Sequence, residues 1–292
     1  MSTQRPIETD AETYNGILHV VDVALKEDIR TGDITSQACL SPDDQISGRL
    51  LLKQGGRLAG LAFLEPLFKK VDPRVEVKLF VEEGGEHRAG TILGTISGPA
   101  WAIFAGERVA LNLLQHASGV ATLTSYYVER TEGYDCDILD TRRTLPGLRC
   151  LERYAVRLGG GKNHRIGLDD RFIIKHNHLS FIARNTKHPI IEAVRRARAH
   201  RANVPIEVEV DDLKQIDQAV ESGADIILLD HMPLPQVRKA VSKIKQKGKA
   251  YVEGVGGVNL ETVDAFAEAG LDGISVPALT FQAQPLEIAL RF

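Results

Sequence analysis

Cysteine is scarce in this sequence. Only three cysteines occur in 292 residues, Cys39, Cys136 and Cys150, and their wide spacing provides neither a disulfide framework nor a CxxC zinc site. This usage fits a reducing compartment. No run reaches the ~18 apolar residues of a membrane span, and the first residues lack the basic and apolar regions of a secretory leader. We therefore expect a cytoplasmic protein that does not cross a membrane.

The sequence also has no excess of positive charge. Its net charge of -3 and isoelectric point near 6.3 argue against a general nucleic-acid-binding protein, because affinity for phosphate backbones needs a basic face. A Walker loop, a dinucleotide glycine fingerprint and a serine nucleophile elbow are missing as well. Any strong positive field must therefore be local.

Hydrophobic patterning changes in character along the chain. Residues 15–27 have the apolar spacing of a helix, whereas residues 46–100 form short alternating stretches that are typical of β-structure. The pattern of residues 101–130 predicts one or two helices. Beyond them, apolar strand candidates alternate with helix-like segments to the end of the chain. These strand candidates are CDILDT, RFIIK, IEVEV, DIILLD, AYVEGV and GISVP.

The alternation of strands and helices favours parallel βαβ units. About six such strands without a dinucleotide fingerprint favour an α/β barrel over a doubly wound sheet. We therefore predict an α/β fold with an N-terminal domain at residues 1–112 and a barrel at residues 113–280. Residues 281–292 follow the last predicted strand and connect to no further one. We expect them to return to the N-terminal domain.

Charged residues end most of the predicted strands, where the active site of a barrel lies. Period-2 alternation places Glu207 and Glu209 on the same inward face of one strand. Buried carboxylates need partners, and Lys175 on a neighbouring strand is a candidate. An internal salt-bridge network without a catalytic role is the alternative. The other charged residues at strand ends are Asp140, Arg142, Arg143, Asp230 and Glu253.

The segment 141–165 is strongly basic, with seven cations against the single acid Glu152. Arginine forks bind carboxylate and phosphate bidentately, so the segment predicts a small polyanionic ligand. Three of the arginines fall four residues apart, which is typical of a solvated helix face. We leave those three, Arg149, Arg153 and Arg157, to that interpretation and assign ligand contacts to Arg142, Arg143 and Arg165.

Gly256 and Gly257 follow a predicted strand, and Asn259 is placed to cap the next helix. Such a loop directs backbone N–H groups at a phosphate, and late loops are the usual phosphate site of barrels. A glycine turn needed only for geometry is the alternative. Four histidines also lie near strand ends, but without the spacing of a zinc site: His164, His176, His178 and His231.

These residues, in this order, resemble the quinolinate phosphoribosyltransferase family, also called carboxylating nicotinate-nucleotide pyrophosphorylase. The likeness covers DVALKEDIRTGDITS, GERVALNLLQHASGVAT, DTRRTLPGLRCLERYAVRLGGGKNHRIGL, IIKHNH, EVEVDD, ILLDHM, VGGVNLETV and ISVPALT. It implies an open α/β sandwich at the N-terminus and an incomplete parallel barrel with fewer than eight strands. It also implies a homodimer, or a higher oligomer, with shared active sites.

The resemblance further implies a reaction of NAD biosynthesis. Quinolinate and phosphoribosyl pyrophosphate would give nicotinate mononucleotide, pyrophosphate and carbon dioxide. Mg²⁺ would arrive with the pyrophosphate group, near Glu209 and Asp230, rather than in a protein cage, and no organic cofactor would be required. The partners are then small molecules and a second copy of the chain, with no nucleic acid and no membrane.

Residue roles follow from the same likeness. Lys175, Glu209 and Asp230 match catalytic residues, and the two acids would face the ribose hydroxyls and the Mg-pyrophosphate. Arg108 matches a residue that the partner subunit contributes. The residues expected around the pyridine dicarboxylate are Thr141, Arg142, Arg143, His164, Arg165 and Lys175. Those expected around the 5'-phosphate are Val255, Gly256, Gly257, Val276, Pro277 and Ala278.

The sequence departs from the family pattern at five of these positions and their neighbours. The family usually has Lys at Arg143, an acid at His176, Asn at His231, Ser at Val255 and Gly at Pro277. Val255 has no hydroxyl and Pro277 no N–H, so the phosphate loop lacks two donors. Two alternatives stay open: a paralogue with another acceptor or sugar phosphate, like the pyrophosphorylase-like proteins of molybdate-transport operons, and a non-catalytic anion-binding protein.

Overall fold

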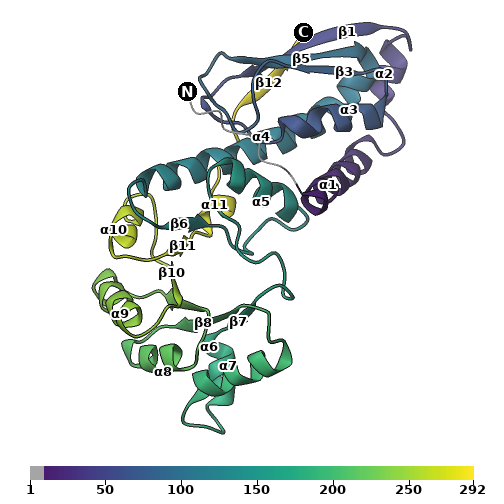
Figure 1. Cartoon of the computed structure of the whole chain (residues 1–292). Coiled ribbons are helices and arrows are strands. Elements are labelled where there is room, and N and C mark those ends of the chain that lie inside the picture. Colours follow the sequence, from purple (N-terminus) through teal and green to yellow (C-terminus); the bar gives the residue numbers. More distant parts are fainter. Residues whose placement is uncertain (1–9) are drawn as a thin grey trace. The chain divides into compact units, whose positions relative to one another are not determined.

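The computed structural model of the chain describes residues 10–292, which pack into two compact units (Figure 1). The first unit comprises the chain up to Ser125 with Arg143–Gly160 and Leu279–Phe292, and the second comprises Tyr126–Arg142 and Gly161–Ala278. Residues 1–9, part of the stretch used above to argue against a leader, lie outside the described residues. Within the described part, no helix is long and apolar enough to cross a bilayer.

An antiparallel sheet forms one layer of the first unit. Its strand order is β12-β1-β5-β3, with β1 (Gln45–Leu52) and β5 (Ile92–Pro99) at the centre and β3 (Glu76–Leu79) and β12 (Ile288–Arg291) at the edges. The C-terminal strand β12 pairs with β1 from Arg49↔Arg291 to Leu52↔Ile288, so the chain end completes this sheet. In Figure 1 the yellow β12 lies beside the purple β1.

Helices cover this sheet and bury its apolar face. Phe68 on α3 (Leu64–Val71), Ile103 on α4 (Ala100–Arg130) and Leu50 and Leu52 on β1 are among the buried residues of one shared core. Local signals set the helix starts, since the Asp10 and Asp33 carboxylates accept N–H groups of the first turns of α1 and α2. The remaining elements are α1 (Ala11–Ile29), α2 (Ile34–Cys39), η1 (Leu61–Phe63), α5 (Arg149–Leu158), α11 (Ala278–Phe281), β2 (Gly56–Arg57) and β4 (Glu86–His87).

The second unit is built on a six-stranded parallel sheet with the order β6-β11-β10-β9-β8-β7. Its central strands are buried on both faces, as is typical of parallel sheets covered by helices. Within the described residues the sheet does not close, because β6 and β7 are its edge strands and do not pair with each other, and β6 meets only Lys162, through a single parallel bridge to Leu139, on its outer side. Its strands are β6 (Asp137–Leu139), β7 (Phe172–Ile174), β8 (Ile206–Val210), β9 (Ile226–Asp230), β10 (Tyr251–Val255) and β11 (Gly273–Ser275).

Helices follow these strands and pack on the outside of the curved sheet, as the green to yellow part of Figure 1 shows. They are α6 (His176–Ile182), α7 (Pro189–His200), η2 (Leu213–Gln215), α8 (Ile216–Glu221), α9 (Leu234–Lys247) and α10 (Val263–Glu268). All six strands expected from the sequence are present, so the prediction of an incomplete α/β barrel is confirmed. Residues 101–130 form the single helix α4, and the domain boundaries at 112/113 and 280/281 stay predictions.

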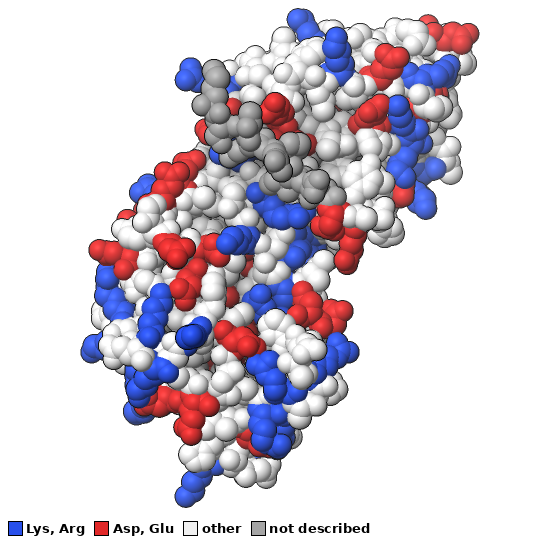
Figure 2. All heavy atoms as spheres, viewed as in Figure 1, with Lys and Arg blue, Asp and Glu red and all other residues white. Residues whose placement is uncertain are grey.

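Charge on the molecular surface is mixed. On the face shown in Figure 2, Lys and Arg side chains alternate with Asp and Glu over both units, without a field of one sign. This distribution agrees with the low net charge. A ligand-binding preference must therefore come from a small group of residues.

We predict that Gly119→Ala will destabilise the protein by about 1–2 kcal/mol. A Cβ at Gly119 in α4 would lie 2.2 Å from the backbone oxygen of Gln284, a close approach that cannot relax as a side chain does. Overpacking costs about 1–3 kcal/mol, and the gain in helix propensity offsets at most about 1 kcal/mol. Urea unfolding measures the difference.

Gly16→Ala in α1 is the matched control, because its added Cβ meets no backbone atom: the Cys150 Sγ at 2.5 Å can rotate away, and the Cys150 Cβ lies at 3.1 Å. Its stability should equal or exceed that of the parent. An unchanged midpoint for Gly119→Ala would show that the residues before β12 are not held tightly against α4.

Candidate active site

Two arginines with mutually repelling charges lie at one end of the parallel sheet. Arg142 follows β6, and Arg165 lies in the loop before β7. Burial and the nearby charge of Arg142 lower the pKa of Arg165 from its usual value. The Nε atoms of both side chains are buried and have no hydrogen-bond partner among the described residues. Two partly desolvated cations with unused donors form a site for an anion with two charges.

Lys175 and Glu209 form an ion pair at the ends of β7 and β8. Lys175 Nζ lies 2.8 Å from Glu209 Oε2, and the His176 backbone N–H donates to Glu209 Oε1 at 3.3 Å. The lysine side chain is 51% exposed, whereas the carboxylate is 11% exposed. The ion pair that the sequence suggested between Lys175 and an inward-facing acid of β8 is present. Its acid is Glu209 rather than Glu207. The pair leaves an ammonium group accessible to a ligand.

Asp230 ends β9 and is joined by its neighbour His231. His231 Nδ1 lies 2.7 Å from Asp230 Oδ1, and the imidazole is 68% exposed. His231 adopts the left-handed backbone conformation with φ 51°, which is uncommon outside glycine. Its ring lies against Gly256, where an added Cβ would come within 2.5 Å of the ring. Gly256 therefore has a packing reason to be glycine, beyond any phosphate.

The loop after β10 differs from the prediction in one respect. Asn259 does not cap α10, because the helix begins at Val263 and its N-cap is Thr262. A turn separates the glycines from the helix, and Asn259 caps that turn by accepting the Glu261 N–H at 2.8 Å. The pattern misled because an Asn before an apolar helical run fits either position. The Asn259 carbonyl also accepts the Val263 N–H at 2.9 Å, so this turn leads directly into α10.

The remaining residues of the predicted phosphate loop lie at the ends of β10 and β11. Val255 is the last residue of β10, paired in register with Asp230 and Ser275 on either side. The Val276 N–H is already used, since it donates to the Leu139 carbonyl at 2.9 Å. Pro277 and Ala278 follow at the start of α11. These residues therefore lie at the ends of two neighbouring strands.

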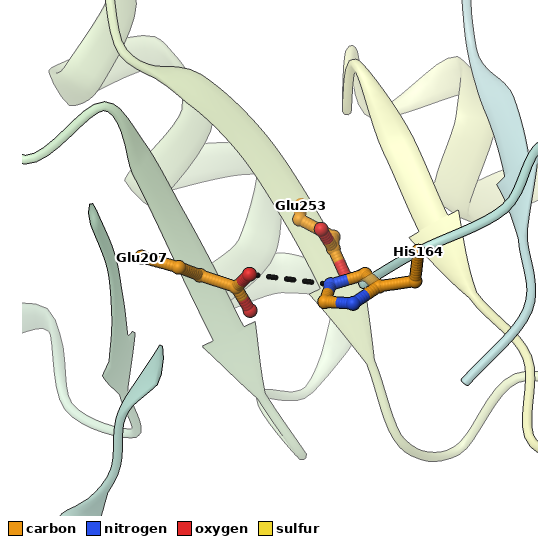
Figure 3. A group of neighbouring side chains, drawn as sticks. All are labelled: His164, Glu207 and Glu253. Atoms are coloured by element: carbon orange, nitrogen blue, oxygen red, sulfur yellow. Dashed lines mark ion pairs between the residues drawn. The ribbon is translucent and has the colours of Figure 1, made fainter. Parts of the chain in front are cut away.

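Deeper in the same unit, two buried carboxylates meet a histidine (Figure 3). Glu207 from β8 and Glu253 from β10 are 0% and 1% exposed. His164 Nε2 lies 3.2 Å from Glu207 Oε2 and 3.4 Å from Glu253 Oε1. Two further groups complete the cluster: Arg171 Nη1 contacts Glu207 Oε2 at 3.1 Å, and the Ser275 hydroxyl donates to Glu253 at 2.5 Å. We call these five residues the buried acid cluster.

The spacing within this cluster is also that of a metal site, since His164, Glu207 and Glu253 each offer a ligand atom within 4.8 Å of the others. Neighbouring cations also bear on the charge of the two acids. Burial alone would lower the pKa of His164, but hydrogen bonds and negative charge from Glu207 and Glu253 outweigh it and raise the pKa to about 9. A protonated His164 and Arg171 offset the charge of both carboxylates, while Glu207 Oε1 and Glu253 Oε2 are buried without a hydrogen-bond partner among the described residues.

Both ring nitrogens of His164 have partners in the protein, and its predicted ligand contact stays a prediction. Its ring nitrogen Nε2 faces the two carboxylates, and the Arg165 backbone N–H lies 2.8 Å from Nδ1. The backbone of His164 is held as well, because its N–H donates to the buried carboxylate of Asp140 at 2.7 Å. Asp140 also accepts from the Asn163 amide at 2.5 Å. The strand-end acid Asp140 therefore fixes the segment that leads into Arg165.

Two predicted site residues belong to the first unit. Arg108 is exposed on α4. Arg143 has an exposed side chain, and its carbonyl accepts the Thr280 hydroxyl at 2.5 Å. The arginines that were assigned to a helix face do lie on α5, where Arg157 pairs with Asp10 at 3.6 Å. Roles for Arg108 and Arg143 stay predictions.

The HNH histidines have local partners. His178 Nδ1 accepts the Lys175 N–H at 2.9 Å and so caps α6. His176 Nδ1 lies 3.5 Å from Asp211, and its Nε2 lies 3.1 Å from the Ser180 hydroxyl. These contacts explain why histidines occur at the start of α6. They also leave Lys175 at the N-cap position, with its side chain directed to Glu209.

Arg171 is the residue that the sequence analysis missed. It precedes β7 and reaches the buried Glu207, with its own side chain only 23% exposed. The signal was available, because period-2 alternation in RFIIK puts Arg171 in phase with Ile173 and Lys175. Because Arg171 is in phase with the inward-facing Lys175, its side chain is also expected to face inward and to pair with an acid on the next strand.

We predict a pH-dependent contribution of His164 to stability. Its folded-state pKa of about 9 lies above the ordinary 6.5, so its stabilisation is fully present below pH 6.5 and is lost as pH rises through 9. The difference in unfolding free energy between the parent and His164→Asn should decrease over that window, by at most roughly 3 kcal/mol. Denaturant titrations from pH 6 to 10 measure it. A constant difference would mean that His164 is neutral in the folded protein.

Known proteins share this architecture. The family profile described as the C-terminal domain of quinolinate phosphoribosyl transferase matches residues 120–291, and the profile of the N-terminal domain matches residues 33–118. NadC from Streptococcus pyogenes superposes with a TM-score of 0.89 at 33% identity, covering 98% of each chain. The nicotinate-nucleotide pyrophosphorylase from Francisella tularensis superposes with a TM-score of 0.88 at 31% identity, covering 99% of each chain.

Curated relatives agree over nearly the full length. The nicotinate-nucleotide pyrophosphorylase (carboxylating) of Mycobacterium leprae is 38% identical over 273 residues, which cover 91% of this chain and 94% of that protein. The probable nicotinate-nucleotide pyrophosphorylase (carboxylating) of Bacillus subtilis is 38% identical over 267 residues, which cover 90% and 89%. With both domain profiles matched, the chain belongs to the quinolinate phosphoribosyl transferase family.

Proposed function

We propose that this protein transfers a phosphoribosyl group from phosphoribosyl pyrophosphate to quinolinate, with loss of carbon dioxide, to form nicotinate mononucleotide and pyrophosphate. It is then a carboxylating nicotinate-nucleotide pyrophosphorylase, a pentosyltransferase of NAD biosynthesis. The observation that carries the proposal is the pair Arg142 and Arg165, with repelling charges and unused buried Nε donors. A dicarboxylate satisfies both guanidinium groups at once.

The cations of the site have the task of holding the acceptor. Arg142, Arg165 and the exposed ammonium of Lys175 lie at strand ends of one unit, where a planar dianion can bind with its ring nitrogen directed at the ribose. Fixing the nitrogen near the sugar C1 replaces a bimolecular encounter with a positioned attack, which contributes much of a rate enhancement. Lys175 thus acts in binding and orientation.

The acids at the neighbouring strand ends have the task of balancing positive charge. As the bond from C1 to pyrophosphate weakens, the ribose gains oxocarbenium-like charge, and the carboxylates of Glu209 and Asp230 stabilise it. Both carboxylates are oriented in advance, Glu209 by Lys175 and Asp230 by His231. After transfer, the ribosylated ring nitrogen accepts the electron pair released by decarboxylation, so the protein needs no organic cofactor.

Magnesium enters this scheme as part of the donor substrate. Carboxylate oxygens suit Mg²⁺, and Glu209 and Asp230 fit a role beside a Mg-pyrophosphate group that keeps most of its own ligands. The metal neutralises the leaving pyrophosphate. The phosphate end would lie at Gly256 and Gly257, where His231 adds an exposed imidazole beside the glycines. Location in the cytoplasm and a homodimeric assembly are part of the same proposal.

The direct test is an assay of the purified protein with quinolinate, phosphoribosyl pyrophosphate and Mg²⁺, with the product followed by mass. Nicotinate as acceptor is the control, because it lacks the second carboxylate that the arginine pair requires. Formation of nicotinate mononucleotide with quinolinate as acceptor, but not with nicotinate, supports the proposal. Product from neither acid, in a folded protein, would favour a paralogue with another acceptor, for which the departures at Val255 and Pro277 are the motivating observation.

We predict that Arg165→Ala will raise the KM for quinolinate at least tenfold, or abolish turnover, while the melting temperature changes by only a few degrees. The reason is that its guanidinium Nε has no partner within the described protein, so the ligand provides the missing one. Arg195→Ala, an exposed arginine paired with Glu192 on α7, is the matched control and should leave the KM unchanged. A large loss of stability in Arg165→Ala would instead assign that arginine to the fold.

We also predict that mixed dimers of two inactive variants regain activity. Arg108 is exposed on α4, and its match in the family reaches the neighbouring subunit's site. Arg108→Ala and Lys175→Ala protomers, each inactive alone, should together give up to about a quarter of parental activity, because random exchange places both native residues in one of four sites. Activity that stays absent after proven subunit exchange would reject the shared site.

A further inference from the structure

The loop from His164 to Arg171 carries Arg165 and joins the basic segment to β7. We call it the Arg165 loop. It is compact at its base and open at its tip: Leu168 is 74% exposed, whereas His164 is 8% exposed. Inside the loop, the Ile166 N–H donates to the Asp170 carboxylate at 2.8 Å. A loop of this kind holds a ligand-binding side chain only if its two ends are fixed.

One carboxylate fixes both ends. Glu207 Oε2 lies 3.2 Å from His164 Nε2 and 3.1 Å from Arg171 Nη1. The first and last residues of the Arg165 loop therefore meet on one oxygen of a fully buried side chain. The contact to His164 does not depend on the charge of the ring, because Nε2 donates in the imidazolium and in one neutral tautomer alike.

The same closure reaches the guanidinium of Arg165. Arg165 Nη1 donates to the carbonyl of Arg171 at 3.0 Å. The guanidinium of Arg165 is therefore held by Arg171, the residue whose side chain pairs with Glu207. Its Nε remains buried without a hydrogen-bond partner among the described residues. One donor of the fork is therefore used to set its direction, and another is left for a ligand.

We propose that Glu207 and Arg171 are positioning residues that close the Arg165 loop and so set the binding of the dicarboxylate. The identity of that ligand rests on the proposed function. Neither residue needs to touch substrate. Loss of either one releases an end of the loop and lets the Arg165 guanidinium move, while the ends of β9 and β10, where the phosphoribosyl donor would bind, keep their own contacts.

The test uses the full-length Arg171→Met and Glu207→Gln variants and two readouts. Hydrogen exchange of the amides from 165 to 170 should become faster in both variants, because the loop opens more often. The KM for quinolinate should rise about tenfold or more, as expected for a misplaced binding group, while the KM for phosphoribosyl pyrophosphate stays within about twofold. The double variant should be no worse than the poorer single one, because both changes break one closure.

Arg74→Met is the matched control. Arg74 pairs with the buried carboxylate of Asp72 in the first unit, so the substitution also leaves a buried acid without its cation. Arg74→Met should nevertheless alter neither the hydrogen exchange of residues 165–170 nor either KM. Arg171→Lys should recover part of the parental KM. If Glu207→Gln does not fold, Arg171→Met, which changes a side chain that is 23% exposed, decides the matter alone.

Unchanged exchange of residues 165–170 in Arg171→Met would overturn the proposal. Equal rises in both KM values would overturn it as well, since a general loss of structure explains them. Faster exchange in a protein that proves inactive on quinolinate would reject the proposed function and leave the loop closure standing.

Discussion

Electroneutrality in the interior of the parallel sheet is the constraint on which the site depends. Glu207 and Glu253 are fully buried on β8 and β10, and a buried carboxylate without a partner costs several kcal/mol. His164 and Arg171 supply the two positive charges that balance them. Both cations belong to the Arg165 loop, which runs from the end of the basic segment to β7. The ion pairs with the buried acids thus fix the position of that loop, and Arg165 is part of it.

This arrangement separates two layers of charge along the strands. Glu207 lies one side-chain step below Glu209 on β8, and the alternation of the strand puts both on one face. The lower acid is closed off by His164 and Arg171, whereas the upper one pairs with the half-exposed Lys175. The lower layer is therefore closed from solvent, whereas the ammonium group of the upper layer is exposed. A substitution in the lower layer acts on chemistry only through what it positions.

Much of this could be predicted from the sequence, because it rests on local patterns. Alternation in IEVEV places Glu207 and Glu209 together, and the spacing of apolar runs predicts all six parallel strands. The ion-pair partner of Glu207 was harder to predict. Glu207 pairs with Arg171 rather than with Lys175, and this choice depends on the register of β7 on β8, Ile173↔Glu207. Strand register is a tertiary property that the local pattern does not contain. Asn259 was misplaced because a turn and a helix start use the same capping residues.

In the proposed function, the arginine pair would also account for selectivity between acids. Burial and then the charge of Arg142 lower the pKa of Arg165, so the protein alone disfavours the charge on that guanidinium. A monocarboxylate neutralises only one of the two cations and leaves the repulsion partly in place. A dicarboxylate removes it and fills both forks, so the second carboxylate gains more than an isolated contact would give. Discrimination then follows from the protein's own unfavourable charge pair, provided that the Arg165 loop keeps the two arginines close.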